Sequence, residues 1–317
     1  MSAEVVTMTE TRDVAVVGGG AAGLSAALVL GRARRTVTVA DAGEPRNAPA
    51  AHMHNYLGRD GTPPAEFLAI GRKEAEGYGA RVVDARVERI EREGRDGPFR
   101  LLLDDGEVLE ARRVLIATGL KDELADIPGL REGWGDYVLH CPYCHGYEVR
   151  DRPIGVLGTG PHAVRQALML KKWSADLVFF PHEQEIADED RLRLEARGVH
   201  VIGGRIRGLV AGGAGLTGVE LDSGTVVPRE AVFAPSTMVP SGELLDGLGC
   251  ARDGDGSAST DAMGRTGVPG VWAAGVVADP MAQVIVAASM GSRAAFAIDH
   301  DLIEEEVEQA VSEYRGR

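Results

Sequence analysis

The fold of this chain is decided by residues 13–41, DVAVVGGGAAGLSAALVLGRARRTVTVAD. The apolar run at residues 13–17 predicts a short strand, and a helix rich in small residues follows the glycines to about residue 33. Residues 36–40 predict a second strand, which ends at an acid. Strand, G-x-G-x-x-G turn, helix, strand and acid, in this order, are typical of a dinucleotide-binding βαβ unit.

Each glycine of the turn has its own task. Gly18 permits the tight turn, Gly20 lets the backbone approach a pyrophosphate, and Gly23 lets helix and strand pack closely. The start of the helix then faces the phosphates, and Asp41 can accept hydrogen bonds from ribose hydroxyls. A purely structural glycine turn is the alternative, but the acid after the second strand favours the dinucleotide site.

A second unit of the same kind begins at residue 154. Residues 154–157 predict a strand, Gly158-Thr159-Gly160-Pro161-His162-Ala163 is G-x-G-x-x-A, and a helix and a strand to Phe180 follow. The chain therefore contains an internal repeat, and we expect two Rossmann-like domains. An NADPH site needs basic residues just past its second strand, but residues 180–185 read FPHEQE. Binding of NADH, weak binding of nicotinamide nucleotides, and no ligand at all stay open.

The segments between these units follow simpler patterns. Residues 42–64 predict a long loop, in which His52 and His54 are better explained as surface histidines than as metal ligands, because we expect no carboxylate or cysteine nearby. A helix to Gly77 should follow. Residues 80–117 predict a small antiparallel β-layer, and residues 199–234 predict further short strands. Ala282 to Ile298 predicts a helix, followed by an acidic helical end at residues 299–317.

The stretch HCPYCHGY, residues 140–147, carries the chemistry. Two thiols two residues apart can close a small disulfide and open it again, so they suit two-electron exchange. C-x-x-C-H also marks attachment of c-type haem, but no export signal is present. A structural zinc site would need a second ligand pair, which the chain lacks, so we expect no metal. Two passive buried thiols remain the plain alternative, and the dinucleotide motifs disfavour it.

Composition limits the class of protein. The chain has 317 residues, enough for two domains, with 44% hydrophobic residues, 42 glycines and a net charge of −14. The acidic balance argues against nucleic acid or an anionic membrane as partner. Residues 1–12 resemble a frayed tail rather than a signal, and no apolar run is long enough to span a membrane. We therefore expect a cytoplasmic protein with reduced thiols.

The order of these motifs resembles the low-molecular-weight thioredoxin reductase family. The first glycine motif is followed by Ala117-Thr118-Gly119, the C-x-x-C, the second glycine motif and Trp272-Ala273-Ala274-Gly275. The resemblance covers residues 12–298 and implies an α/β fold of two Rossmann-like, three-layer ββα domains, and a homodimer. The FAD domain, residues 13–120 and 241–317, would be split around an inserted pyridine-nucleotide-type domain, residues 121–240.

The resemblance also assigns site residues. Cys144 would be the thiol that faces the flavin, and Cys141 the thiol that exchanges with substrate. Within the cofactor set, Asn55 matches a flavin-contacting asparagine and Val87 would touch the adenine. The residues implied to bind FAD are Gly18, Gly20, Ala21, Ala22, Gly23, Asp41, Arg46, Asn55, Val87, Ala117, Thr118, Gly119, Gly275, Gln283 and Val284.

Three departures from the reductase pattern favour one branch of the family. His145 replaces the acid after the second cysteine, the arginines past the second glycine motif are absent, and Val276 replaces an aspartate that Asp279 could stand in for. Cys-Pro-Tyr-Cys-His-Gly-Tyr-Glu resembles the dithiol oxidase branch, which closes disulfides in natural products such as holomycin and gliotoxin. That branch passes electrons from a dithiol to oxygen without a nicotinamide cofactor.

The function that follows is an FAD-dependent dithiol oxidase acting on a small dithiol of natural-product type, as in antibiotic biosynthesis, with oxygen as acceptor. His145, with His140 as a second candidate, would accept protons from substrate thiols. The first alternative is an NAD(P)H-dependent reductase of the thioredoxin reductase type. The second is a non-catalytic flavin redox sensor, for which no effector domain is visible in the sequence.

Overall fold

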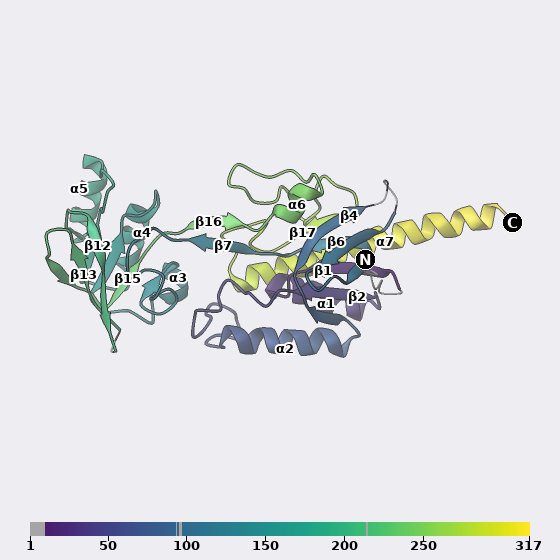
Figure 1. Ribbon diagram of the computed structural model, residues 1–317, viewed down its shortest axis with the longest axis horizontal. Coiled ribbons are helices and arrows are strands. Elements are labelled where there is room, and N and C mark those ends of the chain that lie inside the picture. The colour runs from purple at the N-terminus through teal and green to yellow at the C-terminus, as the bar shows by residue number, and fades with distance from the viewer. Residues whose placement is uncertain (1–9, 93, 95–96, 214) are drawn as a thin grey trace, which may run out of the picture. The chain divides into compact units, whose positions relative to one another are not determined.

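The computed structural model describes residues 10–92, 94, 97–213 and 215–317 (Figure 1). The chain divides into two compact units. The first unit contains the described residues up to Ala48, then Pro64–Lys121 and Val239–Arg317. The second unit contains Pro49–Pro63 and Asp122–Met238. The sequence placed residues 49–63 with the first unit, but this segment packs in the second. Of the predicted tail, residues 1–9 lie outside the described residues.

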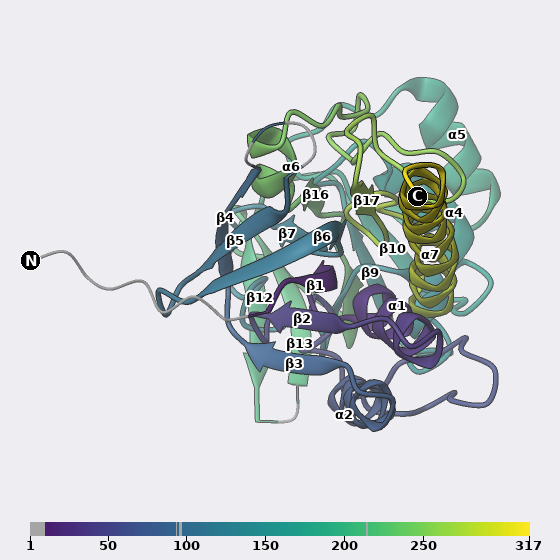
Figure 2. The same ribbon diagram turned by 90° about the vertical axis from the view of Figure 1, so that its right-hand side faces the viewer.

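The first unit is built on one seven-stranded sheet with the order β3-β2-β1-β6-β5-β4, and β17 pairs with β6 (Figure 2). β1, β2, β3, β6 and β17 are parallel where they pair, whereas β4, β5 and β6 form antiparallel pairs. The strands are β1 (Arg12–Val17), β2 (Val37–Asp41), β3 (Arg81–Asp84), β4 (Val87–Arg92), β5 (Phe99–Leu103), β6 (Val108–Ile116) and β17 (Val271–Ala273).

One strand differs from the sequence prediction. We assigned residues 81–83 to a separate antiparallel layer, but β3 pairs in parallel with β2. The helix α2 (Pro64–Gly77) connects these two strands, and a helical crossover between neighbouring strands leaves them parallel. The antiparallel strands β4 and β5 extend the same sheet from β6 rather than forming a layer of their own.

Helices α1 (Ala21–Arg32) and α7 (Val284–Arg315) lie side by side along the sheet of the first unit (Figure 2). Small residues permit this close approach: a Cβ at Gly291 would lie 1.9 Å from the backbone oxygen of Ala22. The sequence predicted a helix from Ala282 to Ile298 and a separate acidic end, whereas α7 continues unbroken to Arg315. The short helix α6 (Glu243–Gly247) completes the unit.

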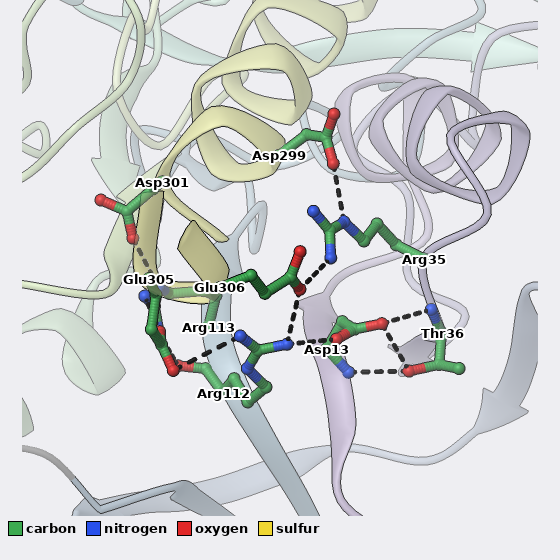
Figure 3. A network of polar contacts seen from close by, with 9 residues as sticks. All are labelled: Asp13, Arg35, Thr36, Arg112, Arg113, Asp299, Asp301, Glu305 and Glu306. Atoms are coloured by element: carbon green, nitrogen blue, oxygen red, sulfur yellow. Dashed lines mark hydrogen bonds and ion pairs between the residues drawn. The ribbon is translucent and has the colours of Figure 1, made fainter. Parts of the chain in front are cut away.

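Ion pairs hold the acidic half of α7 to the sheet (Figure 3). Arg112 of β6 lies 2.8 Å from Asp13 of β1 and 3.2 Å from Glu306. Arg113 lies 2.6 Å from Asp301 and pairs with Glu305 as well. Other bonds join Arg35 to Asp299 and Glu306, at 2.7 and 2.5 Å. Four acids of α7, Asp299, Asp301, Glu305 and Glu306, are therefore paired with basic residues of the same unit.

The second unit contains a five-stranded sheet with the order β11-β10-β9-β15-β8, in which the pairs are parallel, and a three-stranded sheet. Phe179, Phe180 and Phe233 fill its core. The predicted α/β class with two Rossmann-like units is confirmed. Its elements are β8 (Val138–Leu139), α3 (Pro142–His145), β9 (Ile154–Leu157), α4 (Ala163–Leu170), β10 (Leu177–Phe180), α5 (Asp188–Ala196), β11 (His200–Val201), β12 (Ile206–Gly212), β13 (Gly215–Leu221), β14 (Val226–Pro228) and β15 (Ala231–Phe233).

Two strands run between the units in sequence. β7 (Leu120–Glu123) leaves the first unit, and β16 (Thr237–Pro240) returns to it; the two strands pair with each other. Among the described residues, no helix has both the length and the apolar character that crossing a bilayer requires.

Candidate active site

The cysteine pair lies at the end of a buried strand. β8 delivers the chain to Cys141, which precedes the four-residue helix α3, and Pro142 occupies the first helical position. Proline suits that position because it has no amide hydrogen to leave unpaired. Cys141 and Cys144 form a disulfide with their Cα atoms 5.2 Å apart. The amides of Cys144 and His145 both donate to the carbonyl of Cys141, at 3.1 and 3.2 Å, so a compact turn holds the pair.

His145, directly after the second cysteine, is half-buried. Burial lowers its pKa below the ordinary histidine value; Glu148 acts in the opposite direction, and His54 and His140 lower the pKa further. The imidazole is therefore neutral at neutral pH. A neutral imidazole next to a disulfide can take a proton from an incoming thiol.

His140, before the first cysteine, is held from two sides. Its carbonyl accepts a hydrogen bond of 2.6 Å from Gln166 of α4, and its Nδ1 lies 3.4 Å from the hydroxyl of Ser236. Ser236 donates to Asp122 at 2.6 Å. Because the single hydroxyl hydrogen is used in that bond, the histidine Nδ1 is the donor toward Ser236. Sequence reasoning missed Asp122 and Ser236, which come from opposite ends of the second unit and carry no local motif.

Asn55 lies against the cysteine turn in the second unit. It adopts a left-handed backbone with φ of 67°, and its side-chain amide donates to the carbonyl of Tyr143 at 2.9 Å. The neighbouring His54 lies 3.4 Å from Glu148 and 3.4 Å from Asp60. Our expectation that no carboxylate lies near this histidine was wrong: Asp60 belongs to the same loop, and Glu148 is distant in sequence. Contact of Asn55 with the flavin stays a prediction.

The first glycine motif forms a cradle at the carboxyl end of β1. The Gly18 amide donates to the carbonyl of Ala40 at 2.8 Å, and a Cβ at Gly23 would lie 1.9 Å from the Gly18 oxygen. Beside Gly20, in contrast, a Cβ would meet nothing within 4 Å. Gly20 is also the N-cap of α1 and provides no side-chain cap. Open space beside Gly20 and a helix start without a side-chain cap together fit a pyrophosphate.

Asp41 is oriented beside this cradle. Its carboxylate accepts from the Gly19 amide at 3.1 Å and lies 3.6 Å from the guanidinium of Arg72. A carboxylate fixed at the end of β2 can accept from the ribose of a dinucleotide. Arg46 follows in the turn after β2, and Val87 is buried at the start of β4. The residues present thus fit the adenosine diphosphate part of FAD.

The other predicted cofactor residues gather at the same edge of the sheet. Ala117 donates to Val17 at 2.8 Å, and its carbonyl lies so close to Gly18 that a Cβ there would be 2.3 Å away. A Cβ at Gly275 would lie 2.9 Å from that of Ala22 on α1. The predicted positions Ala21, Gln283 and Val284 stand at the starts of α1 and α7. Carboxyl ends of parallel strands and two helix starts therefore converge here.

Thr118 and Gly119 are bonded to the returning chain of the same unit. The Thr118 hydroxyl donates to the carbonyl of Ser241 at 2.5 Å, and the Ser241 amide donates to the carbonyl of Gly119 at 3.0 Å. Asp279, which we considered as a substitute for the missing aspartate, accepts from the Met281 amide at 3.0 Å. It lies in the turn between Gly275 and α7. Contact of any of these side chains with the flavin stays a prediction.

The second glycine motif differs from the first. A Cβ at Gly160 would lie 3.0 Å from the side chain of Pro235, and the Thr159 hydroxyl donates to the Pro235 carbonyl at 3.3 Å. Pro235 thus lies where Gly20 in the first motif has open space. A pyrophosphate needs close approach to the backbone at this glycine, so the site does not fit a nicotinamide dinucleotide in this arrangement.

The end of β10 is also occupied by protein contacts. His182 has a φ of 61°, and its Nδ1 accepts from the amide of Ile206 at 3.0 Å. Glu183 pairs with Arg205 at 3.0 Å. The sequence showed no arginine just past this strand; Arg205 arrives from the segment after β11, which local spacing did not reveal. Its charge is already balanced by the acid.

Among the described residues, no group of three or more histidine, cysteine or acidic side chains could hold a metal ion. Cys250 is buried apart from the disulfide, in the first unit. Its pKa is raised by burial, so it is a poor nucleophile. The redox chemistry of the described chain therefore centres on Cys141 and Cys144.

Comparison with known proteins identifies the family. The family model described as pyridine nucleotide-disulphide oxidoreductase matches residues 12–291. The crystal structure of HlmI is 53% identical, with a TM-score of 0.94, and the alignment covers 97% of this chain and 98% of that one. Thioredoxin reductase sirT of Leptosphaeria maculans is 31% identical over 88% of this chain and 90% of its own length. Thioredoxin reductase tcpT of Claviceps purpurea is 31% identical over 83% of this chain and 85% of its own.

These similarities confirm the predicted resemblance to thioredoxin reductase-like flavoproteins, the enzyme class, and FAD as the cofactor. The cradle at Gly18–Gly23 and the disulfide at Cys141–Cys144 are the two features of the chain that such an enzyme requires. The chain belongs to the pyridine nucleotide-disulphide oxidoreductase family and is an FAD-dependent thiol–disulfide oxidoreductase.

Proposed function

We propose that this enzyme is a dithiol oxidase: it closes a disulfide in a small dithiol of natural-product type and passes the electrons to oxygen. The observation that carries the proposal is the contrast between the two glycine motifs. Space lies open beside Gly20, whereas Pro235 stands beside Gly160 and acids follow β10. The first motif suits FAD, and the second is a poor source of hydride from a nicotinamide nucleotide.

In the proposed exchange, a substrate thiolate attacks the sulfur of Cys141. A new substrate–Cys141 disulfide forms, the Cys141–Cys144 bond breaks, and Cys144 leaves as a thiolate. The second substrate thiol gives its proton to Nε2 or Nδ1 of His145 and attacks the substrate sulfur of the mixed disulfide. The product leaves as a cyclic disulfide, Cys141 is released as a thiolate, and the enzyme pair has gained two electrons.

The bridge must then close again. FAD, held at the Gly18–Gly23 cradle, would supply the two-electron acceptor for this closure, and oxygen with two protons would take up the pair as hydrogen peroxide. The chain contributes the turn that keeps the two sulfurs near each other and the imidazole that holds the substrate proton. His145 suits this task because burial keeps it neutral, ready to accept a proton at neutral pH.

The test is substitution of each cysteine. Cys141→Ser and Cys144→Ser should each abolish dithiol-dependent oxygen consumption and peroxide formation, while FAD stays bound. Turnover that survives in both variants would contradict the scheme, because neither could then be part of the exchanging bridge. Cys250→Ser is the matched control and should retain turnover, since its thiol lies buried apart from the pair.

A second function is supported by the names of the relatives. The proteins of Leptosphaeria maculans and Claviceps purpurea are called thioredoxin reductases. A reductase would move electrons in the opposite direction, from a nicotinamide nucleotide to a disulfide, and would need Pro235 to leave the glycine turn. Rapid reduction of the enzyme by NADPH or NADH would favour it.

We also propose that the enzyme is a homodimer, as the family resemblance implies. Light scattering coupled to gel filtration should then give twice the chain mass of 33.5 kDa. A mass of one chain would contradict this. The cytoplasmic location stays a prediction.

A further inference from the structure

The loop Met53–Gly61 leaves the first unit in sequence and packs in the second, with the cysteine turn. Its ends are tied together, because the Gly61 amide donates to the Met53 carbonyl at 2.9 Å and the Met53 amide donates to Thr62 at 3.0 Å. The Met53 side chain is buried and anchors the loop. Although the loop follows β2 in sequence, it is therefore an ordered part of the second unit, which also contains the cysteine pair.

Two side chains at the tip of this loop contact the redox turn. The Asn55 amide donates to the carbonyl of Tyr143, which stands between the two cysteines. Nε2 of His54 lies 3.4 Å from Glu148, four residues past Cys144, and Nδ1 of the same ring lies 3.4 Å from Asp60. The backbone amide of Asn55 donates to the carboxylate of Asp60 at 2.9 Å, so His54, Asn55 and Asp60 form one connected group.

We propose that the loop Met53–Gly61 is a clasp for the cysteine turn, and that Asn55 and His54 are positioning residues for thiol–disulfide exchange. The proposal rests on the exchange proposed above. The other predicted role of this segment, contact of Asn55 with the flavin, makes a different prediction in the test below.

The need for a clasp follows from the length of α3. A helix of four residues cannot pair its last carbonyls within itself, and the Tyr143 carbonyl accepts from the Asn55 side chain instead. When the bridge opens, the covalent link between Cys141 and Cys144 is lost. A donor fixed on Tyr143 then keeps the turn closed, and the two sulfurs stay near enough to re-form the bond.

The second contact of the clasp acts through charge. The charged groups that act on the pKa of His145 are Glu148, His54 and His140. The negative charge of Glu148 raises the pKa of His145, and His54, held against Glu148, lowers it. Burial has the largest effect on the pKa of His145, and the contact of His54 with Glu148 adds a smaller shift, in addition to holding the turn.

The experiment is a single anaerobic turnover of the FAD-loaded full chain with dithiothreitol. Oxidised dithiothreitol per enzyme is measured after acid quenching, between about pH 5 and 9. This readout reports exchange at the cysteine pair, and neither oxygen nor the natural substrate enters it. The variants are Asn55→Gly, His54→Gln and Glu148→Gln. His52→Gln is the matched control, because His52 is an exposed histidine two residues from His54.

Asn55→Gly keeps the left-handed backbone and removes the donor, so any loss belongs to the hydrogen bond. We expect the single turnover to slow about five- to tenfold, the equilibrium worth of one hydrogen bond, with FAD content unchanged. Asn55→Asp tolerates the same backbone and faces the carbonyl with an acceptor, so it should be slowed as well. Loss of FAD with unchanged turnover per bound FAD would overturn the clasp in favour of flavin contact.

The two charge variants should move the pH profile in opposite directions. The rate rises with pH as His145 loses its proton. Glu148→Gln removes the group that raises this pKa and should shift the rise to lower pH; His54→Gln should shift it to higher pH. A profile of His54→Gln that coincides with His52→Gln would contradict the role of His54. If the wild-type enzyme oxidises no dithiothreitol, the proposed function fails, and the clasp fails with it. If the wild-type enzyme oxidises dithiothreitol and the variants match its rate and pH profile, only the clasp fails.

Discussion

At the residue scale, burial of His145 makes a prediction about pH. Its pKa is lowered mainly by burial, so the base form persists to a lower pH than in an exposed histidine. His145→Ala should reduce the dithiol oxidation rate about a hundredfold, the typical contribution of a general base. The remaining rate should climb steeply with pH, because it then depends on substrate that ionises unaided. Initial rates across a pH series give both results.

The control for this variant is His200→Ala, at an exposed histidine of β11 in the same unit. It should leave the rate and the pH profile unchanged. If His145→Ala retains the wild-type profile, the imidazole is not the base.

Alanine substitutions at two glycines of the first motif should have different effects, one on FAD binding and the other on stability. A Cβ at Gly20 meets nothing within 4 Å, so Gly20→Ala should fold normally and lose FAD, because the methyl group occupies the predicted phosphate position. A Cβ at Gly23 would lie 1.9 Å from the Gly18 oxygen, so Gly23→Ala should unfold at lower urea concentration whether or not FAD is bound. Flavin absorbance and urea unfolding separate the two, and full FAD occupancy of Gly20→Ala would refute the assignment.

The sequence was informative where a residue's role follows from its neighbours in the chain. The turn at Gly18–Gly23 and the pair Cys141–Cys144 each lie within a few residues, so spacing alone predicts their geometry. The contact of Asn55 with Tyr143 joins residues 88 positions apart, and that of Thr118 with Ser241 joins residues 123 apart. No local pattern records such contacts, because tertiary packing creates them.

At the scale of elements, the contact between α1 and α7 predicts a large effect of one methyl group. Gly291→Ala would place a Cβ 1.9 Å from the backbone of Ala22, which cannot move without displacing the glycine motif. We expect a loss of about 1–3 kcal/mol in the free energy of unfolding, as in other overpacked cores. Urea unfolding followed by circular dichroism measures it.

Gly77→Ala is the matched control in another helix. A Cβ at Gly77, in α2, meets nothing within 4 Å, so this substitution should be neutral or stabilise by up to about 1 kcal/mol. Equal effects of the two substitutions would show that helix propensity, and not the α1–α7 contact, governs Gly291.

Elements were predicted well where periodicity is strong and less well where pairing decides. The helix ending at Gly77 and the strand at Ile154–Leu157 follow from their patterns. The place of β3 in the parallel sheet does not, because four residues fit either kind of pairing equally. α7 also extends to Arg315, beyond the apolar stretch that ends at Ile298, because ion pairs to Arg112 and Arg113 support its acidic half.

At the scale of the whole molecule, the ion pairs around α7 predict sensitivity to acid. For Asp13, burial alone would raise the pKa, but bonds from Thr36 and Arg112 outweigh it and lower the pKa. The pKa of Glu306 is lowered mainly by its hydrogen bond to Arg35. A carboxyl whose folded pKa is depressed contributes stability above its unfolded pKa and loses it as pH falls. The urea concentration at half unfolding should therefore decrease as the pH is lowered past about 4.

Arg112→Met tests whether this network is the cause. Methionine keeps much of the apolar length of the side chain and removes the charge that faces Asp13 and Glu306. The variant should be less stable at neutral pH and lose less of its stability on acidification than the wild type. Parallel stability curves for the two proteins would assign the acid sensitivity to other carboxylates.

The direction of electron flow is the central claim, and an anaerobic titration of the flavin absorbance band tests it most directly. One sample of FAD-loaded enzyme receives NADPH and then NADH, and another receives a small dithiol; air is admitted to both at the end. The account predicts that the dithiol alone bleaches the flavin, and that air restores the colour with formation of hydrogen peroxide. Rapid bleaching by a nicotinamide nucleotide would contradict it and make the enzyme a reductase in which Pro235 does not obstruct the second glycine motif.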